Sequence, residues 1–147
     1  MRIAPHLHPL HPALAHFPLA FWLGSCASDL LALKTGTPVW WTVSHHAVAG
    51  GVIMGALALA AGLLELWLRA LPRAAVRWVA VHASLMSAAL LLFMVSLSLR
   101  AASPPPFAAL AISFLGSALI VAGGFCGGTL VYRFGVGVTE RAEWHES

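Results

Sequence analysis

Three ionisable side chains of this 147-residue chain lie near the same end of long apolar segments: His16, Glu65 and His82. Each belongs to a different segment. At a helical rise of 1.5 Å per residue, all three lie roughly 6–8 Å below the boundary that these segments share in an up-and-down bundle. An ionisable group at that depth in a membrane is costly and indicates a functional site. The sequence therefore predicts that two imidazoles and one carboxyl group meet there.

Two imidazoles at one level on different helices are suitable axial ligands for a haem iron. The leading interpretation is a b-type haem held between His16 and His82, in a protein that transfers electrons. Arginines at the same end would pair with the propionates, and these are Arg73, Arg77 and Arg133. The glycine-dense stretch 123–128, which includes Gly124 and Gly127, would leave room for a flat ring.

Two other interpretations stay open. The same residues, His16, His82 and Glu65, form a two-histidine, one-carboxylate set that would suit a non-haem metal such as iron, or zinc if His11 joined them. Alternatively, the three groups form a hydrogen-bonded polar cluster in an accessory or structural subunit of a larger respiratory or photosynthetic complex.

The remaining histidines fall into two groups. His11 lies about 140° around a helix from His16 and shares a stripe with Asp29 instead. With His6 and His8 it is expected at the membrane interface, solvated or in contact with a metal or a propionate.

His45 and His46 lie at the opposite boundary, where Asp29 and Arg100 are the only strongly polar candidates. They are candidates for a second cofactor site that a partner subunit would complete, although an interfacial location is the simpler expectation.

The composition is that of an integral membrane protein. The chain is 60% hydrophobic and 9% charged, with a mean hydropathy of +0.86, whereas soluble domains carry about 25% charged residues. Four apolar runs are long enough to cross about 30 Å of hydrocarbon. They predict an all-α, single-domain four-helix membrane bundle with helices at about 12–33, 42–68, 76–99 and 107–134.

The N-terminal stretch is poor in Lys and Arg and rich in Pro and His, unlike a signal peptide, so the first helix is expected to stay in the protein. Six of the eight Lys and Arg residues lie on the face that carries both termini. The positive-inside rule therefore places both termini in the cytoplasm.

The sequence contains no nucleophile beside a base, no phosphate loop and no paired acids, so a stand-alone enzyme is not expected and no catalytic residue is assigned. The basic pI rests on few charges and does not indicate nucleic-acid binding. Cys26 and Cys126 fit no disulfide or metal motif and are expected to be packing residues.

Motifs at both ends resemble one known family. These are His-Pro-Ala-Leu-Ala-His-Phe-Pro at 11–18, an acid near the end of the second helix, a histidine early in the third, and the stretch 127–138. They are similar to those of an uncharacterised family of small four-helix bacterial membrane proteins with a domain of unknown function. Relatives in that family are fused to Rieske iron–sulfur or c-type cytochrome domains, which implies electron-transfer partners. The resemblance carries over His11, His16, Glu65, His82 and 127–138, although this chain has Glu65 where the family commonly has Asp. The expected partners are membrane lipid, other redox subunits in a homo- or hetero-oligomer, and a quinone, c-type cytochrome or iron–sulfur protein.

Overall fold

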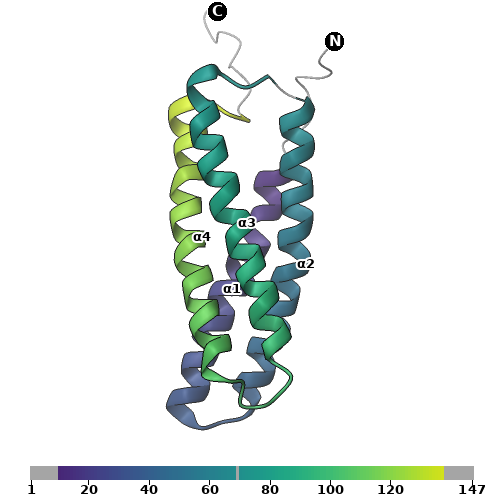
Figure 1. The fold of residues 1–147 in the computed structure, drawn as a ribbon, viewed down its shortest axis with the longest axis vertical. Coiled ribbons are helices and arrows are strands. Elements are labelled where there is room, and N and C mark those ends of the chain that lie inside the picture. Colours follow the sequence, from purple (N-terminus) through teal and green to yellow (C-terminus); the bar gives the residue numbers. More distant parts are fainter. Residues whose placement is uncertain (1–9, 69, 138–147) are drawn as a thin grey trace, which may run out of the picture.

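The computed structural model describes residues 10–68 and 70–137, and within them the chain forms four long helices. They are α1 (Leu10–Thr35), α2 (Val39–Leu68), α3 (Val76–Leu99) and α4 (Phe107–Phe134), with a short 3-10 helix, η1 (Arg73–Ala75), before α3 (Figure 1). The prediction of an all-α helical bundle is confirmed. The bounds of α3 and α4 coincide with the predicted ranges, whereas α1 and α2 begin slightly earlier.

The helices begin and end at residues that suit those positions. Pro106 precedes α4 with an extended backbone, and a proline there fixes φ without removing a helical hydrogen bond. Gly135 ends α4 in the left-handed conformation at φ 63°. Its N–H donates to Val131 O, and the N–H of Val136 donates to Leu130 O. This arrangement satisfies carbonyls that the end of the helix leaves free.

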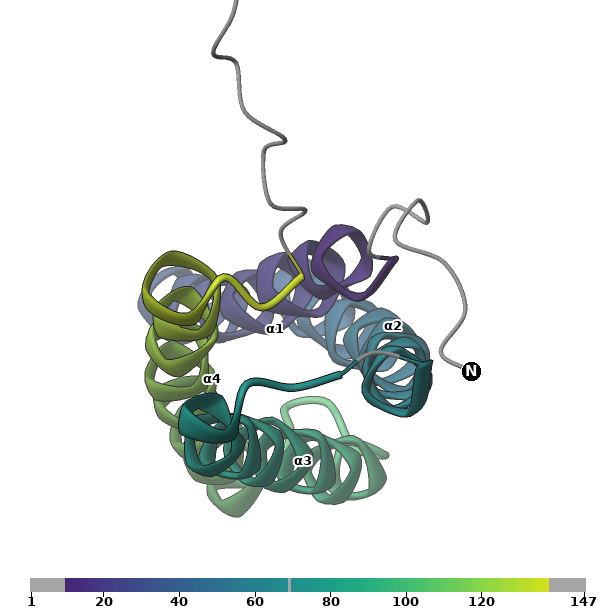
Figure 2. The same ribbon diagram turned by 90° about the horizontal axis from the view of Figure 1, so that it is seen from above.

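The bundle consists of two helical hairpins. α1 packs along α2, and α3 packs along α4, with more limited contact between the two pairs. Figure 2 shows the four helices arranged around a common centre. Three of the described helices, α2, α3 together with η1, and α4, are long and apolar enough to cross a membrane. α1 is of similar length, but it carries Ser25, Ser28 and Asp29, which are buried inside the bundle.

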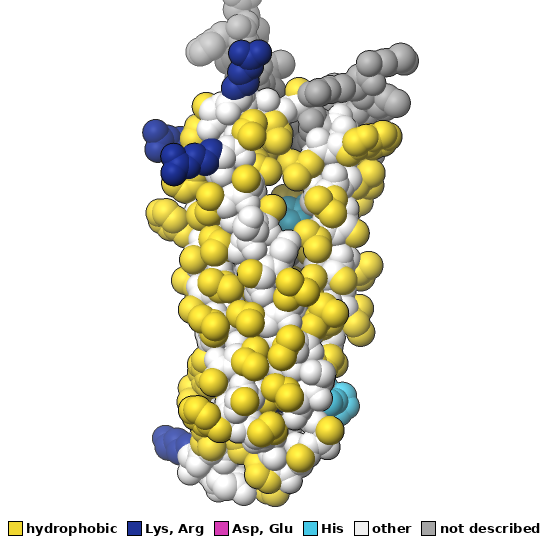
Figure 3. All heavy atoms as spheres, in the orientation of Figure 1, with side chains coloured by type: hydrophobic (Ala, Val, Ile, Leu, Met, Phe, Trp, Pro, Cys, Tyr) yellow, Lys and Arg dark blue, Asp and Glu magenta, His cyan; other side chains and the backbone are white. Residues whose placement is uncertain are grey.

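The centre of the bundle is closed by two stacked aromatic rings. Trp22 of α1 lies 4.6 Å from Phe93 of α3, centroid to centroid, with nearly parallel rings, and both side chains are fully buried. Glycines make room for them, because a Cβ at Gly51 or Gly55 would collide with the indole and one at Gly116 would collide with Phe93. The predicted small-residue stripes therefore allow close helix packing here. The outside of the bundle is covered with exposed apolar side chains (Figure 3).

Candidate functional site

Two imidazoles from different hairpins face each other in the half of the bundle nearest to the start of α1 and the end of α4. The rings of His11 on α1 and His82 on α3 lie 6.0 Å apart, centroid to centroid, and are nearly perpendicular at 87°. Two metal–nitrogen bonds of about 2 Å each, with half an imidazole beyond each bond, separate two ring centroids by about 6 Å. At this spacing the two rings would be able to hold one metal-containing group between them.

His11 is held in place by α2. Its Nδ1 lies 2.7 Å from Ala58 O, and its backbone N–H donates to Glu65 Oε1 at 2.9 Å. Because His11 is in the first turn of α1, that N–H has no partner within its own helix. The Glu65 carboxylate therefore caps α1 from a neighbouring helix, at the end where the helix dipole favours negative charge. Gly62 packs against the ring, since a Cβ there would lie 3.0 Å from Nδ1.

His82 is held in the same way by α4. Its Nδ1 lies 2.8 Å from Gly123 O, and a Cβ at Gly127 would lie 3.1 Å from Cε1 of the ring. A carbonyl oxygen can only accept a hydrogen bond, so Nδ1 of both His82 and His11 carries the proton and Nε2 has the free lone pair. This is the tautomer that metal-binding histidines adopt when a backbone carbonyl orients them.

The packing around the two histidines is looser than in the rest of the bundle. The buried residues of α2 end at Ala58, and those of α3 begin at Ala89. Beyond these points, towards the histidines, the facing side chains of both helices are at most half-buried. Figure 3 shows histidine atoms at the bottom of a hollow between α3 and α2. The bundle is therefore closed around Trp22 and Phe93, whereas it is open between the hairpins around the two histidines.

The prediction that His16 meets His82 is wrong. His16 is exposed on the outside of α1, and the ring that faces His82 belongs to His11. The physical reason is helical rotation: five residues turn the side chain by about 140°, so one of the two histidines points inward and the other outward. Glu65 does lie at the site, but it contacts the backbone of His11.

The predicted non-haem metal set is not assembled. Among residues 10–68 and 70–137, no three His, Cys, Asp or Glu side chains come close enough to hold a metal ion. His6 and His8 lie outside the described residues. His45 and His46 contact each other at 5.5 Å between ring centroids, far along α2 from Glu65. His46 Nδ1 lies 2.8 Å from Thr42 O of its own helix.

Several residues expected around a cofactor do not contact the two imidazoles. Gly127 touches His82, but Gly124 is exposed with open space beside it. Arg73, Arg77 and Arg133 are all exposed. Arg77 precedes His82 by five residues and so points about 140° away from it around α3. The structure therefore gives these arginines no contact with the two imidazoles.

A second polar site, at the opposite end of the bundle, was not predicted. Arg100 is buried and forms an ion pair with Asp29, with side chains only 1% and 0% exposed. Its five N–H groups are all used: Nη1 and Nη2 donate to the two Asp29 oxygens at 3.0 and 2.6 Å, and the others donate to Ser44, Ser96 and Ser113. The cluster joins all four helices. The signal in the sequence was that Asp29 and Arg100 lie at the same boundary.

The comparisons with known proteins identify the family. A family model described as "Predicted membrane protein (DUF2231)" matches residues 7–140. The chain belongs to this family. A search of curated proteins and a search of solved structures each find no match. The part that matches the DUF2231 family includes His11, Glu65 and His82 as well as the buried pair Asp29 and Arg100.

Proposed function

We propose that this protein is a membrane-embedded electron-transfer protein in which His11 and His82 bind a b-type haem. The observation that carries the proposal is the facing pair of imidazoles, 6.0 Å apart, each with Nδ1 bonded to a backbone carbonyl and Nε2 free. His11 and His82 would hold the haem iron, with one imidazole from each helical hairpin. A haem held this way supplies reversible one-electron chemistry.

The chain's own residues would orient and tune the iron ligands. The hydrogen bonds to Ala58 O and Gly123 O fix the direction of both rings and raise the basicity of Nε2. Glu65 fixes the first turn of α1 and so the height of His11. Gly62 and Gly127 let each ring pack directly against the helix behind it, because a Cβ at either position would press on the ring.

The proposal extends to location and partners. The family resemblance implies a bacterial inner membrane, and the positive-inside rule supports an orientation with both termini in the cytoplasm. Electrons would be exchanged with other membrane redox subunits, a quinone, or a c-type cytochrome or iron–sulfur protein, as the family resemblance implies.

An absorption spectrum of the purified protein, oxidised and then reduced, tests this function. We expect an intense Soret band and reduced α and β bands in the wild type, with one haem per chain. If protein expressed with a full supply of haem has no Soret band, it is not a haem protein.

A second candidate is a structural or accessory subunit of a larger respiratory or photosynthetic complex. It is favoured by the fact that the two imidazoles also link helices: His11 joins α1 to α2, and His82 joins α3 to α4. Under this function, His82→Gln would lower the stability of the bundle with no spectroscopic change, since the wild type would have no visible absorbance to lose.

A further inference from the structure

Two arginine–aromatic pairs lie side by side where α3 begins and α4 ends. Arg77 and Trp78 are in the first turn of α3, and Arg133 and Phe134 are the last two residues of α4. The rings of Trp78 and Phe134 are 6.4 Å apart, centroid to centroid. The Arg133 guanidinium lies over the Phe134 ring at 5.5 Å. We call these four residues the arginine–aromatic patch.

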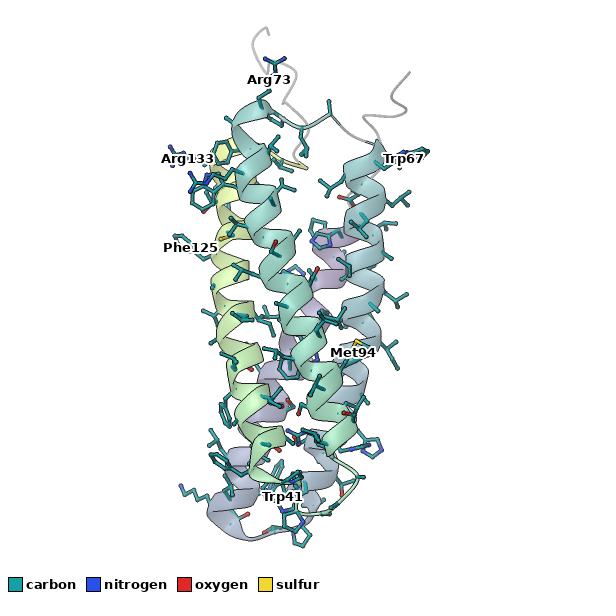
Figure 4. The ribbon with its side chains drawn as sticks, viewed as in Figure 1. Trp41, Trp67, Arg73, Met94, Phe125 and Arg133 are labelled. Carbon is teal, nitrogen blue, oxygen red and sulfur yellow. The ribbon has the colours of Figure 1, made fainter. Side chains whose placement is uncertain are left out.

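The patch opens to the outside of the bundle. Arg77 and Arg133 are exposed, whereas Trp78 and Phe134 are half-buried. Figure 4 shows Arg133 pointing outward from α4, away from the centre of the bundle, with Arg73 on η1 above it. Apolar side chains continue down the same two helices: Val81 is 41% exposed, Phe125 74% and Tyr132 93%.

No acidic side chain of the described residues neutralises these arginines. Only two acids are described: Asp29 is paired with Arg100 at the far end, and Glu65 accepts the N–H of His11. The other three acids, Glu140, Glu143 and Glu146, lie outside the described residues. Among residues 10–68 and 70–137, the only ion pair is that of Asp29 with Arg100.

We propose that the arginine–aromatic patch binds the phosphate headgroup of an anionic phospholipid. Two guanidinium groups offer paired donors that match the geometry of a phosphate. The aromatic rings and the exposed apolar side chains below them suit the acyl chains of the same molecule. An acidic soluble protein would instead approach the water-facing end of the bundle, whereas this patch lies on the flank of α3 and α4 and continues into the apolar surface. The inference does not depend on the haem.

Thermal unfolding of the full-length protein in a neutral detergent tests the proposal. Phosphatidylglycerol, phosphatidylcholine and inorganic phosphate are titrated separately, and the shift in melting temperature gives each apparent affinity. The test variant is Arg77→Gln/Arg133→Gln. The matched control is Lys34→Gln, which removes an exposed cation at the opposite end of the bundle.

We expect wild type and Lys34→Gln to bind phosphatidylglycerol more tightly than phosphatidylcholine. The double variant should bind phosphatidylglycerol roughly 30-fold more weakly, which corresponds to about 1 kcal/mol per arginine. Equal phosphatidylglycerol binding by wild type and double variant would overturn the proposal. So would inorganic phosphate binding as tightly as the lipid, since the site would then be one for free phosphate.

Two further outcomes also decide the matter. In the first, lipid has no effect in any variant, and the triple variant Glu140→Gln/Glu143→Gln/Glu146→Gln has a lower melting temperature than the wild type. The C-terminal segment of the same chain then occupies the patch, and the lipid proposal fails. If the double arginine variant loses a haem spectrum that the wild type shows, the arginines hold the cofactor and the proposal also fails. A normal haem spectrum with loss of the lipid preference supports it.

Discussion

Removing the carboxylate of Asp29 should lower the free energy of unfolding more than removing any exposed charge. The Arg100 guanidinium beside it is buried, and Asp29 accepts two of its five N–H groups. In Asp29→Leu the positive charge stays in the bundle with only three serine hydroxyls as partners. Breaking a buried ion pair by removing one partner costs about 3–5 kcal/mol, because the other charge is left uncompensated.

The double variant Asp29→Leu/Arg100→Met separates this cause from simple loss of packing. It removes both charges, and replacing a whole buried pair by apolar side chains is often neutral or stabilising by about 1–4 kcal/mol. We therefore expect the double variant to lie close to the wild type in its free energy of unfolding, or above it. The coupling energy between the two positions should be at least about 3 kcal/mol, far above the usual error of about 0.5 kcal/mol for independent sites.

The cycle consists of the wild type, the single variants Asp29→Leu and Arg100→Met, and the double variant. Their equilibrium unfolding in mixed micelles is followed by the circular dichroism of the helices. Lys34→Met is the control, because it removes an exposed charge from the same end of the bundle and should change the free energy of unfolding by no more than about 0.5 kcal/mol. An Asp29→Leu variant that loses less than about 1 kcal/mol, with an additive double variant, would refute the reasoning.

Two further predictions concern packing and the capping carboxylate. Gly51→Ala should lower the free energy of unfolding by about 1–3 kcal/mol, because the added Cβ would collide with Trp22, whereas Gly24→Ala, with open space around it, should have little effect in the same unfolding assay. Glu65→Gln keeps an oxygen to accept the N–H of His11, so the haem should stay bound. Its midpoint potential should rise, because a nearby negative charge no longer favours the oxidised iron. Glu65→Leu should lose the cap, which costs about 0.5–2 kcal/mol of stability, and should bind less haem. Redox titration of the reduced bands measures the first effect, and an unchanged potential in Glu65→Gln would contradict it.

The fold class and the helix bounds could be predicted because the apolar runs are long and interrupted by prolines, glycines and charges. Run length alone requires spanning helices, and an even number of antiparallel helices brings Glu65 and His82 to the same level. The depth of a residue follows directly from the helical rise. Rotation about the helix axis does not, and that is why His16 was assigned the place that His11 occupies.

The position of Asp29 in the sequence is enough to single out His11. Asp29 is the most costly residue of α1 to expose to lipid, so its stripe must face inward. His11 shares that stripe, whereas His16 is turned away from it by about 140°. The cost of exposing Asp29 also favours its pairing with Arg100, which directly follows α3 at the same end of the bundle. The serines that complete the cluster could not have been singled out, since small hydroxyl residues also serve packing throughout the bundle.

Comparing the haem content of His11→Ala with that of His16→Ala is the most direct test of whether His11 and His82 hold the haem. Both variants remove one imidazole from the same helix, five residues apart, so general effects on insertion and expression are matched. We predict that His11→Ala loses the haem spectrum, as His82→Ala does, while His16→Ala keeps the wild-type intensity per chain. A His16→Ala variant without haem, next to a His11→Ala variant with a full complement, would contradict the pairing of His11 with His82.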